Sequence, residues 1–145
     1  MEVVGLIKKM LPDAVVDDAV LDAIALSACA DGVVKEEMDA MRRMARELPS
    51  SRSLDEAAIE ARIEASFARI HDDGLDARLE AIANAALDDD TRKRMFTAAA
   101  IVQYADGHVT NEENEFLLDL ADALGLDEAR VRAIVSEIEK QLGIG

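Results

Sequence analysis

The chain has 145 residues, half of them hydrophobic, which suits a single domain with a real core rather than a disordered chain. Seven glycines and two prolines are too few to form the turns of a many-stranded fold, so the composition excludes most β-sheet proteins. The net charge of −15 disfavours nucleic acid and anionic membrane surfaces as partners, and it favours cations and basic proteins.

The first half of the chain predicts four helices. A short helix is expected over 4–11, and residues 15–30 are apolar almost all round, which indicates a buried helix. An amphipathic helix follows over 36–48. The next begins at Ser53, which can form a capping box with Glu56.

The second half predicts a similar series. A short amphipathic helix is expected over 79–86 and a second nearly all-apolar helix over 95–105, followed by amphipathic helices over 110–124 and 127–138. Their ends are marked by residues that favour helix boundaries: Gly74, Asp88, Thr110 with Glu113, Gly125 and Asp127. The sequence therefore predicts an all-α fold, a compact bundle of seven to eight helices in one domain spanning 1–145.

A constant offset of 75 residues, from Asp31 to Asp106, relates the two halves of the chain. The tripeptide Ala-Asp-Gly recurs at this offset, and the pattern continues without a gap in either direction. The matched pairs include Val34 with Val109, Met41 with Phe116, and Ile63 with Ile138. We interpret the chain as a duplicated four-helix unit with pseudo-repeats 1–70 and 76–145. The two nearly all-apolar helices are then expected to pack together at the centre.

The two Asp-Gly turns are the constellation in this sequence that could carry chemistry. Each reads Ala-Asp-Gly-x-Val-x-x-Glu, and seven residues of turn can bring its Asp and its Glu towards one point. Hard divalent cations such as Ca²⁺, Mg²⁺ and Mn²⁺ prefer oxygen ligands of this kind. The predicted metal ligands are Asp31, Glu37, Asp106 and Glu112, with Glu36 and Glu113 near by.

Other kinds of site were weighed against this one. In a purely structural interpretation, each Asp accepts backbone hydrogen bonds in its turn and each Glu complements a helix N-terminus. An EF-hand is excluded, because Asp106 at its fifth position would put Val102 and Tyr104 at its first and third. One cysteine and two distant histidines give no zinc spacing, and neither a nucleophile elbow nor a phosphate loop occurs. We therefore expect no enzymatic activity.

The residues around the two turns resemble the TerB family of tellurite-resistance-associated proteins, which is related to a domain of some DnaJ-type co-chaperones. The resemblance is carried by Ala-Cys-Ala-Asp-Gly-Val-Val-Lys-Glu-Glu at 28–37 and Tyr-Ala-Asp-Gly-His-Val-Thr-Asn-Glu-Glu at 104–113. It implies a compact bundle of about seven helices, an acidic surface and a role in metal or stress response. The family's acidic motif carries over to Asp31 and Glu37, and to Asp106 and Glu112.

Two classes of function follow. A metal-binding stress protein needs convergent carboxylates, although Lys35, which stands where the second repeat has Thr110, would compete with a cation near Asp31. A helical protein-protein interaction module, as in the co-chaperone relatives, needs an exposed docking face and no metal. The N-terminus lacks the features of a signal peptide, and no apolar run approaches the roughly 18 residues of a membrane span. We expect a cytoplasmic protein.

Overall fold

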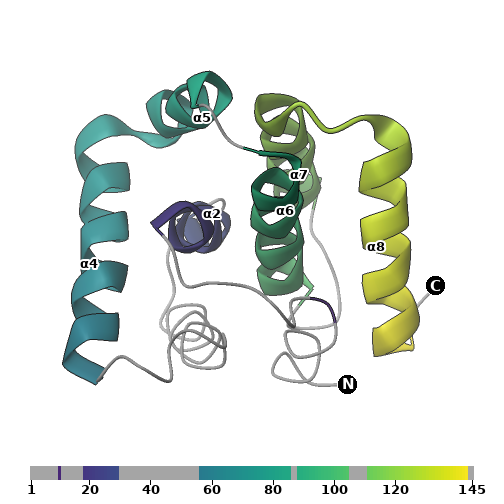
Figure 1. The fold of residues 1–145 in the computed structure, drawn as a ribbon, viewed down its shortest axis with the longest axis horizontal. Coiled ribbons are helices and arrows are strands. Elements are labelled where there is room, and N and C mark those ends of the chain that lie inside the picture. The colour runs from purple at the N-terminus through teal and green to yellow at the C-terminus, as the bar shows by residue number, and fades with distance from the viewer. Residues whose placement is uncertain (1–9, 11–17, 30–55, 86–87, 105–110, 144–145) are drawn as a thin grey trace.

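The computed structural model describes Met10 and residues 18–29, 56–85, 88–104 and 111–143 (Figure 1). In these ranges the chain is all-helical and contains no strand, which confirms the predicted fold class. The helices predicted over 4–11 and 36–48 lie outside the described residues. The described helices are α2 (Asp18–Cys29), α4 (Glu56–Asp73), α5 (Leu75–Asn84), α6 (Asp89–Gln103), α7 (Asn111–Leu124) and α8 (Glu128–Leu142).

The helices α2 and α6 form the centre of the described bundle. They contact each other more extensively than any other pair of described helices. On its other side α2 packs against α4, and α6 packs against α8, so that these four helices follow one another across Figure 1. The short helix α5 bridges α4 and α7, and α7 also packs against α6. The expectation that the two most apolar helices pack together at the centre is therefore confirmed.

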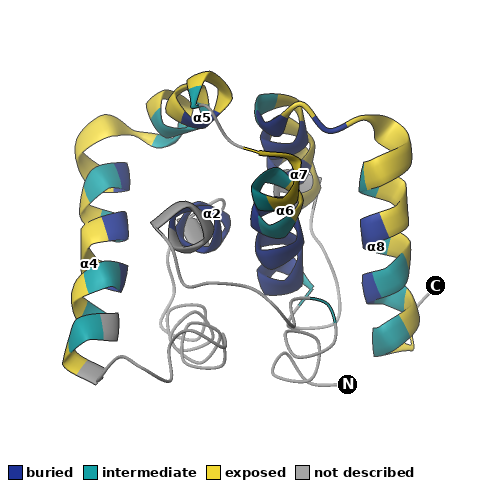
Figure 2. Ribbon diagram, viewed as in Figure 1, coloured by how far each residue is buried: buried dark blue, intermediate teal, exposed yellow. Residues whose placement is uncertain are grey.

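Small side chains allow the two central helices to approach closely. Ala23 and Ala25 of α2 are fully buried, as is the run 98–100 of α6, which consists of three alanines (Figure 2). The Ser27 hydroxyl of α2 donates a hydrogen bond of 2.8 Å to the Ala99 carbonyl of α6. Because a serine side chain is short, it can reach the backbone of a neighbouring helix only at close range. The alanine-rich composition of these helices thus fixes their spacing.

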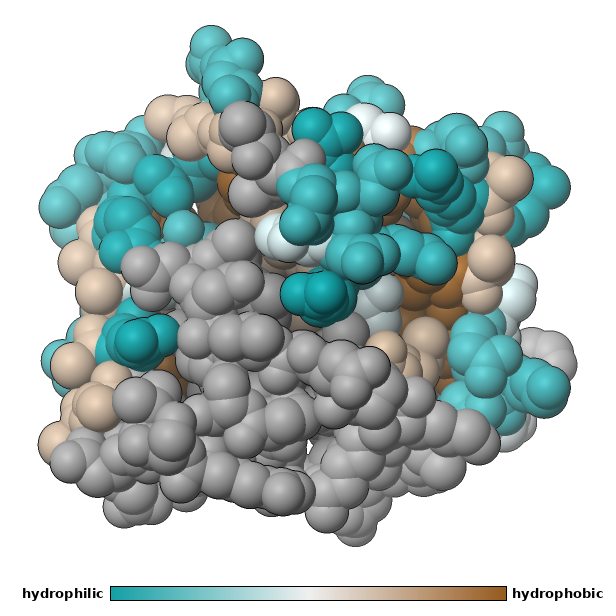
Figure 3. Space-filling model, viewed as in Figure 1, coloured by the Kyte–Doolittle hydropathy of each residue, from teal (hydrophilic) through white to brown (hydrophobic). Residues whose placement is uncertain are grey.

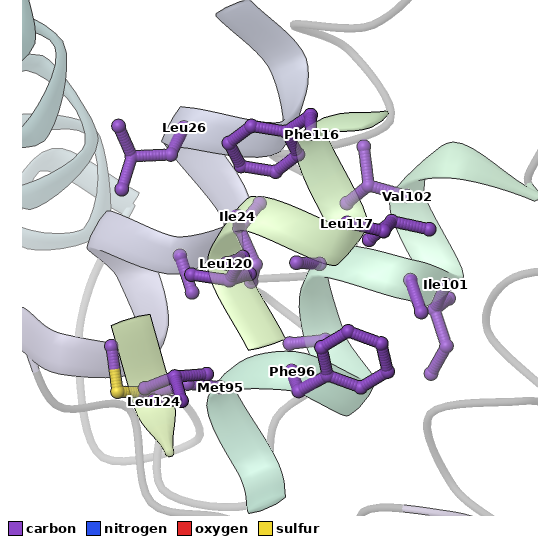
Figure 4. Close-up of a cluster of buried hydrophobic side chains, with 14 of the residues drawn as sticks. Ile24, Leu26, Met95, Phe96, Ile101, Val102, Phe116, Leu117, Leu120 and Leu124 are labelled. Carbon is purple, nitrogen blue, oxygen red and sulfur yellow. The ribbon is translucent and has the colours of Figure 1, made fainter. Parts of the chain in front are cut away.

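Larger apolar side chains fill the space around this contact (Figure 4). Phe96 is completely buried, and Phe116, Leu120 and Leu124 of α7 join it in one hydrophobic core with Ile24 of α2. Hydrophilic side chains cover much of the described part of the face drawn in Figure 3. Burying apolar side chains supplies the main stabilising free energy of a helical domain.

Local signals set most of the described helix ends. The Asp88 carboxylate accepts a hydrogen bond of 2.7 Å from the Thr91 amide, and Asp127 does the same for Arg130 at 2.8 Å. Hydrogen bonding by Thr91 also lowers the pKa of Asp88. Gly125 has a φ of +70°, which lets the chain leave α7 sharply. The nearly all-apolar stretch predicted over 95–105 belongs to a helix that begins at Asp89, with Asp88 as its N-cap, as the acids expected at its N-terminus indicate, and this helix ends at Gln103.

Candidate functional site

The predicted metal ligands fall mainly on residues that the structure does not describe. Asp31, Glu36, Glu37 and Asp106 lie outside the described ranges, and Glu112 and Glu113 occupy the first turn of α7. Among the side chains described within 18–29, 56–85, 88–104 and 111–143, no group of three His, Cys, Asp or Glu is arranged to hold a metal ion. The cation site at the two turns therefore stays a prediction.

A polar contact between Ser27, Ala99 and Gln103 joins the two central helices near their C-terminal ends, and we call it the α2–α6 junction. Besides the hydrogen bond from Ser27 to Ala99, the Gln103 Nε2 donates to the Ser27 carbonyl at 3.1 Å. Ser27 lies in the last turn of α2 and Gln103 is the last residue of α6. The C-terminal ends of the two central helices therefore lie side by side.

Only one of the two polar atoms of the Gln103 side chain has a hydrogen-bond partner among the described residues. The residue is 2% exposed, and its Oε1 is buried without a hydrogen-bond partner among the described residues. An unpaired buried carbonyl oxygen costs about 1–3 kcal/mol. Sequence analysis missed this residue because a glutamine belongs to no motif here. The available signal was a polar residue closing an otherwise apolar stretch of α6.

A second buried polar group lies nearer the start of α2. The Asp22 side chain is 11% exposed. Its Oδ1 accepts a hydrogen bond of 2.6 Å from Arg69 Nη2, and its Oδ2 accepts one of 3.0 Å from Arg78 Nη2. Arg69 Nη2 also donates to Ser66 Oγ at 3.1 Å. These four residues, the Asp22 cluster, tie α2 to α4 and α5. Because both oxygens of Asp22 are engaged by arginine, the cluster is suited to architecture rather than to holding a cation.

A third polar contact joins the end of α6 to α8. The Tyr104 hydroxyl donates a hydrogen bond of 3.0 Å to Glu139 Oε1. Burial, together with this hydrogen bond, raises the pKa of Tyr104 to about 12. Tyr104 directly follows Gln103, so the end of α6 is fixed to helices on both of its sides.

An open cavity of about 170 Å³ lies beside the N-terminal half of α6. It is lined by Met10, Asp90, Lys93, Arg94 and Thr97. The Thr97 hydroxyl donates to the Lys93 carbonyl at 2.7 Å, so no base activates it as a nucleophile. The lining carries charges of both signs and presents no nucleophile paired with a base.

Comparison with known proteins identifies the family. The sequence model described as tellurite resistance protein TerB matches residues 18–136, from the first residue of α2 into α8. No curated protein and no solved structure matches the chain. None of the described helices is long and apolar enough to cross a membrane. The match covers most of the chain, including both Asp-Gly turns, and the chain therefore belongs to the TerB family of tellurite resistance proteins.

Proposed function

We propose that this chain is a non-enzymatic, cytoplasmic binding protein of the tellurite-resistance type. It binds a divalent cation through Asp31, Glu37, Asp106 and Glu112, with Glu36 and Glu113 close to the same site. The observation that carries the proposal is the α2–α6 junction, because it makes the C-terminal ends of the two central helices neighbours.

The chain length between these helix ends and the acids supports pooling of the carboxylates. Asp31 follows the last residue of α2 by two positions, and Asp106 follows the last residue of α6 by three. A chain spans at most about 3.5 Å per residue, and separations this short favour pooling of the carboxylates. Four carboxylates near one point repel one another, and a divalent cation relieves that repulsion.

We also infer that the domain is a duplicated four-helix unit, with pseudo-repeats 1–70 and 76–145 and seven to eight helices in all. Two observations support this. In each half an outer helix packs against a central one, α4 against α2 and α8 against α6. Residues at the offset of 75 are buried alike, as with Leu26 and Ile101, and with Ile63 and Ile138. Superposing the two halves in a crystal structure tests the inference, and different helix orders would refute it.

Thermal unfolding of wild type and Asp106→Asn, each with and without millimolar Ca²⁺ or Mg²⁺, tests cation binding. A cation at a hundredfold excess over its Kd adds about 2.7 kcal/mol to the free energy of unfolding. For a domain of this size that raises the Tm of wild type by roughly 8 °C, and Asp106→Asn should show a smaller rise. Asp119→Asn, which removes an exposed carboxylate from the middle of α7, is the matched control. Equal Tm values with and without cation would refute the proposal.

The second candidate function, a protein-protein interaction module without metal, is favoured by one surface of α7. Leu118 is 55% exposed, and Glu115, Asp119 and Asp122 are exposed beside it on the same helical face. Such a face suits a basic amphipathic helix. This alternative predicts that cations leave the Tm unchanged and that a lysine- and leucine-rich helical peptide shifts the NMR signals of α7 in wild type but not in Leu118→Ser.

A further inference from the structure

The open cavity beside α6 lies at the other end of this helix from the α2–α6 junction. Four of its lining residues come from α6 at the spacing i, i+3, i+4, i+7, which places them on one helical face: Asp90, Lys93, Arg94 and Thr97. Met10 adds a partly buried apolar side chain. The cavity therefore presents two cations, a carboxylate, a hydroxyl and a thioether to one small space.

The two cations of this lining are available to a ligand. Neither Lys93 nor Arg94 forms an ion pair with any residue that the structure describes. Asp90 stands four positions before Arg94, the spacing at which ion pairs form along a helix, and it lines the same cavity. In a chain with a net charge of −15, the absence of such a pair does not come from a shortage of acids. The lining is therefore suited to an anionic group from outside.

The neighbouring base Arg92 has a different place. It does not line the cavity, and its Nη1 lies 3.7 Å from the position that a Cβ atom on Gly125 would occupy, directly after the end of α7. A cation near the C-terminus of a helix stabilises it, which accounts for Arg92 within the fold. The three consecutive bases 92–94 are thus divided between a structural contact and the cavity.

Size and charge select the anion. The cavity has a volume of about 170 Å³. A cavity of about 150 Å³ holds a molecule of the size of benzene, so a ligand of roughly six to eight non-hydrogen atoms fits here. Two cations and one carboxylate give the lining one net positive charge, which matches a monoanion better than a phosphate dianion. The planar guanidinium of Arg94 also matches the two oxygens of a carboxylate.

The other polar atoms of the lining require a hydrogen-bond donor. The Thr97 hydroxyl donates its hydrogen to the Lys93 carbonyl at 2.7 Å, so towards a ligand its oxygen can only accept. The Asp90 carboxylate is likewise an acceptor. A ligand that carried a carboxylate alone would leave both acceptors without a donor.

We propose that this cavity binds a small carboxylic acid that also carries a hydrogen-bond donor, that is, a hydroxy acid or an amino acid. The carboxylate of the ligand binds Lys93 and Arg94. Its hydroxyl or ammonium group donates to Asp90 and to Thr97 Oγ1, and its carbon chain lies against Met10. This site is separate from the proposed cation site and does not depend on it.

NMR titration of the ¹⁵N-labelled chain tests the proposal with three probes of similar size. These are 3-hydroxybutyrate, 3-aminobutyrate, and butyrate, which lacks the donor. We expect the better of the two donor-bearing acids to shift the backbone signals of residues 93–97 with a Kd of about 1 mM, and butyrate to bind at least about fivefold more weakly. The better probe identifies the ligand as a hydroxy acid or an amino acid. No saturable shift up to about 50 mM, or equal binding of butyrate, would overturn the proposal.

Two variants of the basic run separate the cavity from general attraction between opposite charges. Arg94→Gln removes a cation from the lining and should weaken binding of the better probe about tenfold. Arg92→Gln removes the same charge one helical turn or less away, but outside the lining, and should change the Kd by less than about twofold. Equal losses in the two variants would overturn the site. If Arg94→Gln does not fold, Lys93→Gln, at an exposed position, replaces it with the same expected loss.

Discussion

The two polar contacts of α2 differ in charge, and each contains one buried side-chain atom without a hydrogen-bond partner among the described residues. At the Asp22 cluster, both oxygens of one carboxylate are engaged by arginines from α4 and α5, while Arg78 Nε has no partner in the described part of the chain. At the α2–α6 junction, three neutral groups meet and the Oε1 of Gln103 is left without a partner in the described part of the chain. The α2–α6 junction is buried and the Asp22 cluster is partly buried, and both join segments that are distant in sequence.

This difference in charge predicts how much each of the two contacts contributes to the stability of the fold. A buried charge is tolerated only when its partners compensate it, so the Asp22 cluster holds helices together and leaves no carboxylate oxygen for a ligand. A buried neutral oxygen without a partner costs free energy, and that cost reduces what the α2–α6 junction contributes to stability. The Asp22 cluster is therefore expected to contribute more to stability than the α2–α6 junction.

The largest expected effect is on the Asp22 cluster. Asp22→Asn removes the charge that compensates Arg69 and Arg78, and we expect it to lower the free energy of unfolding by about 3 kcal/mol. Urea denaturation measures this change. The control is Asp119→Asn, which neutralises an exposed aspartate and should change stability by less than about 0.5 kcal/mol. A loss below about 1 kcal/mol for Asp22→Asn would show that the cluster is not a structural clamp.

A smaller effect is expected at Tyr104, beside the α2–α6 junction. Tyr104→Phe removes the hydrogen bond to Glu139 and should lower the free energy of unfolding by about 1 kcal/mol at neutral pH. The folded pKa of about 12 lies above the ordinary value of 10.0, so between these pH values the folded chain keeps a proton that the unfolded chain loses. Wild-type stability should therefore fall from pH 10 to 12 more steeply than that of Tyr104→Phe.

The titration of Tyr104 can be observed directly, because the chain contains one tyrosine. Phenolate absorbance of the folded protein should appear near pH 12 rather than near pH 10. Absorbance that rises around pH 10 while the protein is still folded would contradict the partly buried hydrogen bond between Tyr104 and Glu139.

The smallest effect is expected at an exposed ion pair on α8. Arg132 Nη2 contacts Glu128 Oε1 across one helical turn, and the two side chains are 76% and 81% exposed. Because solvent screens such pairs, Arg132→Gln should change the free energy of unfolding by less than about 0.5 kcal/mol. This value gives the baseline against which Asp22→Asn is judged. A loss comparable to that of Asp22→Asn would mean that burial does not distinguish the two ion pairs.

Local interactions made much of the fold predictable. The capping aspartates Asp88 and Asp127 and the turn at Gly125 were found from sequence because each acts on residues only a few positions away. The start of α5 was placed too late, since its first turn carries little apolar periodicity. The acids of the two turns were found from a repeated motif, and their grouping stays a prediction.

The sequence by itself determined the family, the all-α class and the two most apolar helices, because composition, periodicity and repeated motifs are properties of short segments. Only the tertiary structure decided which polar groups meet. Asp22 accepts hydrogen bonds from Arg69 and Arg78, which are 47 and 56 residues away in the sequence. Gln103 donates a hydrogen bond to Ser27, which is 76 residues away. No local pattern encodes such pairings. They follow from the close packing of α2 against α4 and α6, and of α5 against α4, which removes water from these groups and makes each partner, or each missing partner, energetically significant.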